Sequence, residues 1–105
     1  MRVPDLIILA VSLLVASHAL AGDGKGLAKK NNCMMCHTVD GKSTGPSFKN
    51  VAAKYRNDKE AQTALEKKVR SGVKGVWGTM PMPATTQSIS DGDIKSMVQW
   101  ILSLE

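Results

Sequence analysis

Large aromatic side chains are scarce in this chain of 105 residues, which has two Trp, one Tyr and one Phe. A domain of this size buries only about 60–65% of the surface that its unfolded chain exposes, so its stability is marginal. Small domains with so little to bury usually need disulfides, a metal or a bound group to hold them together. We therefore expect something besides side-chain packing to stabilise the fold.

Cysteine is also scarce, because Cys33 and Cys36 are the only two in the chain. A disulfide between residues so close together would close a very small loop, and such a loop contributes little stability. Histidine is limited to His18 and His37, and no segment alternates convincingly between polar and apolar residues as a strand would. These absences make a disulfide-stapled or β-rich domain improbable.

The first 21 residues have the pattern of an export signal. Arg2 precedes an apolar run at residues 6–16, and residues 19–21 read Ala-Leu-Ala, the small-x-small form that signal peptidase accepts. A retained anchor is the alternative, but the run is shorter than the roughly 20 residues of a bilayer span. The sequence predicts a cleaved signal peptide at residues 1–21, one mature domain at residues 22–105, a periplasmic location and no stable membrane insertion after cleavage.

The net charge is +5, from 14 Lys and Arg against 9 Asp and Glu. The basic residues are mostly lysines, dispersed from Lys25 to Lys95, and few aromatic side chains could stack on bases. This pattern does not predict nucleic-acid binding. Dispersed lysines usually serve only to keep a protein surface soluble. If they have a function, we expect it to be electrostatic steering towards an acidic partner.

Four helices are predicted, each after a residue that can cap a helix N-terminus. The expected caps are Asp23, Ser47, Asp58 and Ser90. The first helix is expected to run to about residue 32 and the second to cover residues 48–55, while the third ends at Gly72 and the last has its apolar face at residues 94–104.

Two segments are predicted to be non-helical, residues 38–46 and residues 72–88. The second contains "GVWGTMPMPATT". Its prolines have a fixed φ, and they push the preceding residues, Met80 and Met82, towards extended conformations. A stiff, extended loop of this kind is suited to aiming a methionine side chain.

The stretch "NNCMMCHTVD" contains Cys-x-x-Cys-His, and three kinds of chemistry use such a spacing. A structural zinc site needs four N or S ligands, but a mature chain without His18 offers only Cys33, Cys36 and His37. A thioredoxin-like dithiol belongs to a βαβ setting, whereas this motif follows a predicted helix. Haem attachment uses both thiols as thioethers and the imidazole as an iron ligand, and it also supplies the missing core. The residues therefore favour haem over zinc and over a redox dithiol.

The iron of such a haem needs a sixth ligand or has an open position. Met34 and Met35 lie inside the attachment loop and cannot reach the opposite haem face, and Met97 belongs to the apolar stripe of the last predicted helix. Met80 and Met82 share the proline loop. Met82 lies between two prolines, so we expect it to be the better held of the two.

Four stretches, "AKKNNCMMCH", "GPSFKNVAAKY", "GVWGTMPMP" and "MVQWILSL", resemble the small bacterial class I c-type cytochromes of the c551/c552 (cytochrome c8) group. The resemblance covers residues 25–105. It implies an all-α class I cytochrome c fold, with about four helices wrapped round one haem c that is covalently attached through two thioether links. The implied site consists of the thioether anchors Cys33 and Cys36, the axial ligands His37 and Met82, Pro46 as acceptor of the imidazole N–H, and Trp77 and Lys68 as partners of a haem propionate.

The chain departs from this group in two places. Relatives commonly read "MPPN", with the Asn amide near the ligand sulfur, whereas this chain reads "MPATTQSIS". Thr85, Thr86 or Gln87 would have to take the place of that amide. Met80 stands where an aliphatic residue is common, so a second thioether lies two residues from Met82.

These observations predict a periplasmic one-electron carrier that shuttles electrons between respiratory redox proteins and has no enzymatic activity. Redox partners with acidic surfaces are expected to dock at an exposed haem edge near the two cysteines. Candidate lysines around that edge are Lys29, Lys30, Lys42 and Lys49. The alternative is a haem enzyme or a gas-sensing haem protein whose sixth position is open or labile.

Overall fold

The computed structural model describes residues 23–105, so the predicted signal peptide and its cleavage point lie outside the described residues. Within this range there is no β-strand, only an isolated antiparallel bridge between Val73 and Met82. None of the described helices is long and apolar enough to cross a membrane. The elements are α2 (Gly24–Lys30), the 3-10 turn η1 (Cys33–Met35), α3 (Phe48–Lys54), α4 (Ala61–Ser71) and α5 (Asp91–Leu102). The prediction of an all-α domain with four helices is confirmed for this part of the chain.

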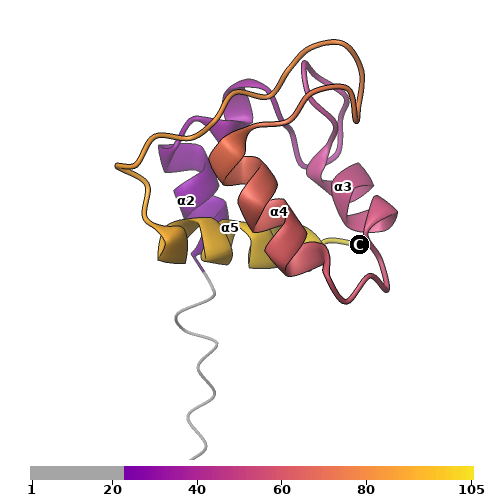
Figure 1. Ribbon diagram of the computed structural model, residues 1–105. Coiled ribbons are helices and arrows are strands. Elements are labelled where there is room, and N and C mark those ends of the chain that lie inside the picture. Colours follow the sequence, from indigo (N-terminus) through magenta and orange to yellow (C-terminus); the bar gives the residue numbers. More distant parts are fainter. Residues whose placement is uncertain (1–22) are drawn as a thin grey trace, which may run out of the picture.

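Helix α5 is the element that the other helices share, because α2, α3 and α4 all pack against it. It runs along the base of the molecule in Figure 1, with α2, α4 and α3 above it. The side chains of Ile94, Met97 and Val98 form its buried face, and Met97 is only 3% exposed. The central cluster comprises Ala28, Val51, Leu65, Ile94, Met97 and Val98. The expectation that Met97 is a core residue is confirmed.

Two of the four predicted N-caps are confirmed by hydrogen bonds. The Ser47 hydroxyl accepts from the backbone N–H of Asn50 at 3.1 Å, and the Ser90 hydroxyl accepts from Asp93 N–H at 3.1 Å. Each bond satisfies an amide that the first helical turn leaves without a partner. Ser47 therefore sets where α3 begins, directly after Pro46.

The other two predicted caps are not confirmed in the same way. Asp23 occupies the N-cap position of α2, as predicted, but its side chain makes no capping hydrogen bond, and the prediction for Asp58 is wrong. Asp58 accepts from the backbone N–H of Glu60 at 2.9 Å, which forms a turn, and α4 begins only at Ala61. Short acidic side chains stabilise turns and helix starts by the same local bond, so the sequence alone does not separate the two.

The segment between α4 and α5 passes over the helices on the side opposite α5 (Figure 1). It starts at Gly72, the predicted end of α4, where φ is 82°. Glycine adopts this left-handed backbone without the penalty that a Cβ carries. A Cβ at residue 72 would also lie only 2.6 Å from the carbonyl oxygen of Met82. Gly72 therefore lets the chain turn out of α4 and pass close to Met82.

Candidate haem site

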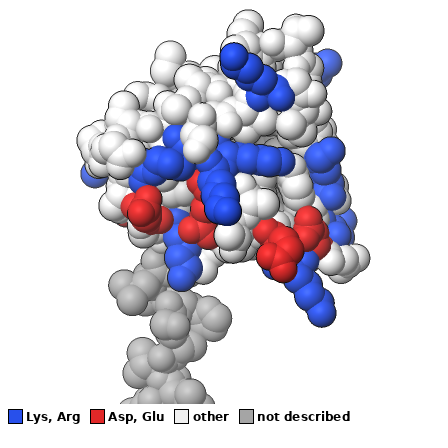
Figure 2. All heavy atoms as spheres, viewed as in Figure 1, with Lys and Arg blue, Asp and Glu red and all other residues white. Residues whose placement is uncertain are grey.

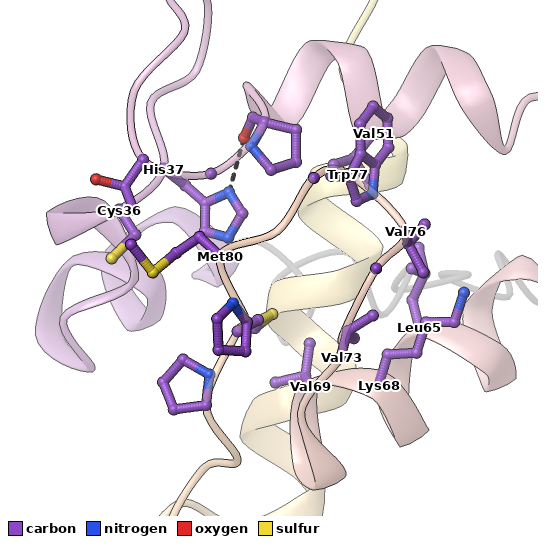
Figure 3. Close-up of a pocket in the computed structure, with 18 of the residues that line it drawn as sticks. Cys36, His37, Val51, Leu65, Lys68, Val69, Val73, Val76, Trp77 and Met80 are labelled. Atoms are coloured by element: carbon purple, nitrogen blue, oxygen red, sulfur yellow. Dashed lines mark hydrogen bonds between the residues drawn. The ribbon is translucent and has the colours of Figure 1, made fainter.

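A largely apolar cavity of about 530 Å³ lies between the attachment motif, α4 and the segment after α4. Figure 3 shows His37 and Cys36 on one side of it and Leu65, Lys68 and Val69 of α4 on the other. The volume is in the range of about 300–1,000 Å³ that is typical of ligand pockets. The cavity therefore lies beside the Cys-x-x-Cys-His motif, at which the sequence predicts a bound group.

The His37 imidazole is held in one orientation by two contacts. Its Nδ1 lies 2.7 Å from the carbonyl oxygen of Pro46, so Nδ1 carries the proton and donates it, because a carbonyl can only accept. The Phe48 ring stacks on the imidazole, with 4.8 Å between centroids and an interplanar angle of 18°. The Phe48 and Trp100 rings in turn form a T-shaped pair, with 5.4 Å between centroids and an interplanar angle of 79°. This arrangement leaves the Nε2 lone pair available for a metal.

Gly45 lies so close to the imidazole that any larger residue would displace the ring or the backbone. A Cβ at this position would lie 2.8 Å from Cε1 and 3.0 Å from Nδ1 of His37. The Gly45 N–H also donates to the carbonyl of Cys36 at 2.6 Å, which folds residues 38–46 back against the motif. Pro46 was expected at this place from the resemblance, but Gly45 and Phe48 were missed. The one feature of the sequence that could have pointed to them is that they lie within two residues of Pro46.

The two cysteines lie on and beside the η1 turn, with both thiols free. The amides of Cys36 and His37 donate to the Cys33 carbonyl at 3.2 and 3.0 Å, which closes the turn. Burial raises the pKa of the Cys33 thiol above its ordinary value. A redox dithiol relies on a lowered pKa instead, so this environment disfavours the dithiol alternative.

The backbone of Met82 is held more firmly than that of Met80. Met82 N–H donates to the Val73 carbonyl at 2.8 Å, and Val73 N–H donates to the Met82 carbonyl at 3.0 Å. The Met82 side chain is partly buried, whereas Met80 is 67% exposed. Both residues line the cavity. The bridge therefore fixes the backbone of Met82 beside the cavity, whereas Met80 is mostly exposed and extends towards Cys36 and His37 (Figure 3).

Polar and cationic groups gather at another part of the cavity wall. The Lys68 ammonium donates to the Tyr55 hydroxyl at 3.0 Å, and both residues line the cavity together with Trp77. Trp77 is 45% exposed, and the Lys54 ammonium lies 5.2 Å from its ring centroid. Lys68 and Trp77 were expected here from the resemblance. Tyr55 was missed, because only the tertiary structure brings it to this wall, and Lys54 was missed because it meets this wall only through the Trp77 ring.

The sequence model of the Cytochrome c family matches residues 21–105 of this chain. The chain belongs to the cytochrome c family. It is 47% identical to cytochrome c-552 of Nitrosomonas europaea over 91% of this chain and 90% of that protein. It is 38% identical to cytochrome c-551 of Pseudomonas aeruginosa over 93% of this chain and 92% of that protein.

The fold of this cytochrome is similar to that of solved relatives. The crystal structure of wild-type Nitrosomonas europaea cytochrome c552 matches with a TM-score of 0.74 at 47% identity, over 77% of this chain and 99% of the relative. The chain is therefore a small class I cytochrome of the c551/c552 group, and the expected fold is confirmed.

Membership of the family implies a covalently bound haem c, and the residues at the cavity fit this group. Cys33 and Cys36 match the Cys-x-x-Cys-His attachment motif. The cavity wall presents an imidazole with a free Nε2 and the Met82 thioether, two donors that suit haem iron. The close fit of Gly45 against His37 shows that the wall is built for that one ring orientation.

Thr85, Thr86 and Gln87 were the three residues expected to place a polar group near the Met82 sulfur. The backbone N–H of Thr85 donates to the carbonyls of Val69 and Arg70, both at 3.3 Å. The Thr86 hydroxyl lies 2.6 Å from that of Ser88, and Gln87 is exposed. None of the candidates Thr85, Thr86 and Gln87 lines the cavity as described, so the segment is held by α4 rather than by side chains at the site.

Gly45→Ala is expected to destabilise the haem-bound protein by about 1–3 kcal/mol, because the added methyl group overlaps the imidazole. Gly41→Ala is the matched control, since a Cβ there meets only the Thr38 hydroxyl at 3.5 Å. Urea unfolding of both variants measures the difference. Equal stability of the two variants would contradict the close fit.

The haem-free chain of residues 22–105 is expected to be largely unfolded. Nine hydrophobic residues are buried in the described chain, three of them alanines, and the adjoining cavity of about 530 Å³ would have to collapse or fill with water. Far-UV circular dichroism of the apoprotein tests this. A cooperative thermal transition without haem would show that the side chains alone suffice.

Proposed function

We propose that this cytochrome is a periplasmic one-electron carrier with His37 and Met82 as the axial ligands of its haem and Cys33 and Cys36 as the thioether anchors. It serves as a shuttle between respiratory redox proteins and performs no catalytic turnover. One observation carries the proposal: His37 and Met82 line the same apolar cavity, each with its position set by hydrogen bonds.

The bound haem supplies a one-electron couple, and the protein sets the conditions for it. The Nδ1–H bond to Pro46 keeps Nε2 aimed into the site and increases its basicity. The soft Met82 sulfur favours reduced iron and raises the potential. With both axial positions supplied by held side chains, little in the protein has to move when an electron is gained or lost.

The wall formed by Tyr55, Lys68 and Trp77 is the proposed site of a haem propionate. Lys68 carries a positive charge there and already donates to the Tyr55 hydroxyl at 3.0 Å. The Trp77 indole N–H is a further donor, and its ring is partly covered by the Lys54 ammonium. Buried carboxylates need such cations and donors to offset the loss of water.

Residues 1–21 are proposed to direct export of the protein to the periplasm.

The surface charge suits a redox partner with an acidic surface better than a nucleic acid. Basic side chains are dispersed over the face shown in Figure 2 rather than gathered in one patch. Lys29 and Lys30 are exposed at the end of α2, just before the attachment motif. Lys49 is less available to a partner, because its ammonium already pairs with the Asp40 carboxylate at 2.7 Å.

Met82→Ala is expected to abolish the far-red charge-transfer band of the ferric protein, which reports a sulfur–iron bond. Met80→Ala is the matched control and is expected to keep the band, since Met80 is 67% exposed and its backbone is outside the Val73–Met82 bridge. Absorption spectra of the two purified holoproteins decide this. Loss of the band in Met80→Ala only, or rapid carbon monoxide binding by the native ferrous protein, would contradict the proposed ligation; the second result would favour an enzyme or gas sensor.

Replacing Lys29 and Lys30 by Glu is expected to slow oxidation of the ferrous protein by hexacyanoferrate(III), an anionic one-electron oxidant. The effect should be about tenfold or more at low ionic strength and should fade as salt is added. The matched control is the double Glu substitution of Lys67 and Lys95, two exposed lysines on α4 and α5 that, unlike Lys29 and Lys30, do not adjoin the attachment motif in the chain. Stopped flow measures the oxidation rates. Equal rates for both variants would show that Lys29 and Lys30 are not part of the docking surface.

A further inference from the structure

Arg70, in the last turn of α4, makes three contacts with the chain that follows Met82. Its guanidinium donates to the carbonyl of Thr86 at 2.9 Å and to that of Ile89 at 2.7 Å. It also pairs with the carboxylate of Asp91 at 2.6 Å, at the start of α5. The Arg70 side chain is 20% exposed, whereas that of Asp91 is 94% exposed. One side chain therefore holds residues 86–91 against α4.

The contact with Asp91 contributes least of the three. Ion pairs with a partner so exposed are worth little, because water screens the charge. The two bonds to backbone carbonyls are charge-assisted, and the planar guanidinium can make both at once. A lysine ammonium has no such fork. The geometry, and not only the charge, of Arg70 makes the attachment.

The backbone of the same helical turn adds a further attachment. A helix leaves its last carbonyls without intrahelical partners, and here the carbonyls of Val69 and Arg70 accept from Thr85 N–H at 3.3 Å. On the other side of the loop, Val73 pairs with Met82 through two backbone hydrogen bonds. The chain is thus attached by backbone hydrogen bonds at Met82, which pairs with Val73 just beyond α4, and at Thr85, which bonds to α4 itself. Residues 74–81, which lie between Val73 and Met82, are all exposed.

We propose that Arg70 is a positioning residue for the axial methionine: by holding residues 86–91 on α4, it keeps the chain after Met82 from lifting and so keeps the sulfur at the iron. This inference rests on the proposed role of Met82 as axial ligand. Without the guanidinium, the Thr85 and Val73 bonds alone hold this end of the loop. The loop then opens more often, although the helices stay packed.

Imidazole, which binds ferric haem iron when the methionine has left it, is the probe. Its apparent affinity is proportional to the fraction of protein in which the loop is open. In Arg70→Gln holoprotein we expect this affinity to rise about tenfold, the effect of losing hydrogen bonds from a charged donor. Asp91→Asn is expected to change it by less than about twofold. Arg70→Lys should lie between wild type and Arg70→Gln, and it also serves if Arg70→Gln does not fold.

The matched control is Arg56→Gln, which removes the same charge from an exposed arginine outside the cavity. It is expected to bind imidazole as the wild type does. A second measurement separates positioning from general destabilisation: in urea, the far-red band of Arg70→Gln should disappear at a lower concentration than the helical circular dichroism. In the wild type the two transitions should lie closer together.

Three results would overturn the inference. The first is that Arg70→Gln binds imidazole no more tightly than Arg56→Gln. The second is that the far-red band and the helical circular dichroism of Arg70→Gln disappear at the same urea concentration, and the third is that Arg70→Lys behaves fully as the wild type. Failure of the proposed ligation would look different, because the far-red band would then survive Met82→Ala. If the band depends on Met82 but not on Arg70, only the positioning role is wrong.

Discussion

The constraint on which the structure depends is a cavity of about 530 Å³ beside a very small core. The helices pack on α5, but their buried residues are few and many are small. A chain of this size cannot keep such a hollow by side-chain packing alone. The covalent haem of the cytochrome c family is therefore part of the core, and the fold is best understood as a shell of helices and loops round it.

The two sides of this shell are held in different ways. On the attachment side, His37 is fixed locally by Pro46, Phe48 and the close approach of Gly45. Met82, the proposed sixth ligand, is bonded instead to Val73, nine residues away in the chain, and the next attachment is that of Thr85 to α4. A side chain held through distant parts of the chain is easier to release than one held by its neighbours. For this reason the attachments of the loop to α4 bear on the proposed ligation.

Much of the fold could be predicted, because its determinants are local. The hydroxyls of Ser47 and Ser90 cap the helices that follow them, and Gly72 ends α4, as predicted. Asp58 was misread because its carboxylate stabilises a turn before α4. At the site, Lys68 and Trp77 could be named from the resemblance, but Tyr55, Gly45 and Phe48 could not. Their roles depend on how close two segments approach, which no spacing rule reports.

The attachment motif, the helical class and the choice of Met82 among the methionines as the proposed ligand could all be read from the sequence. They follow from covalent spacing, from capping and from the stiffness that proline imposes, all of which act within a few residues. The pairing of Val73 with Met82, the stacking of Phe48 on His37 and the hold of Arg70 on residues 86–91 are visible in the folded molecule alone. Arg70 and its partners lie 16 to 21 residues apart along the chain. Such contacts depend on the packing of α4 against α5, because that packing brings these distant residues together.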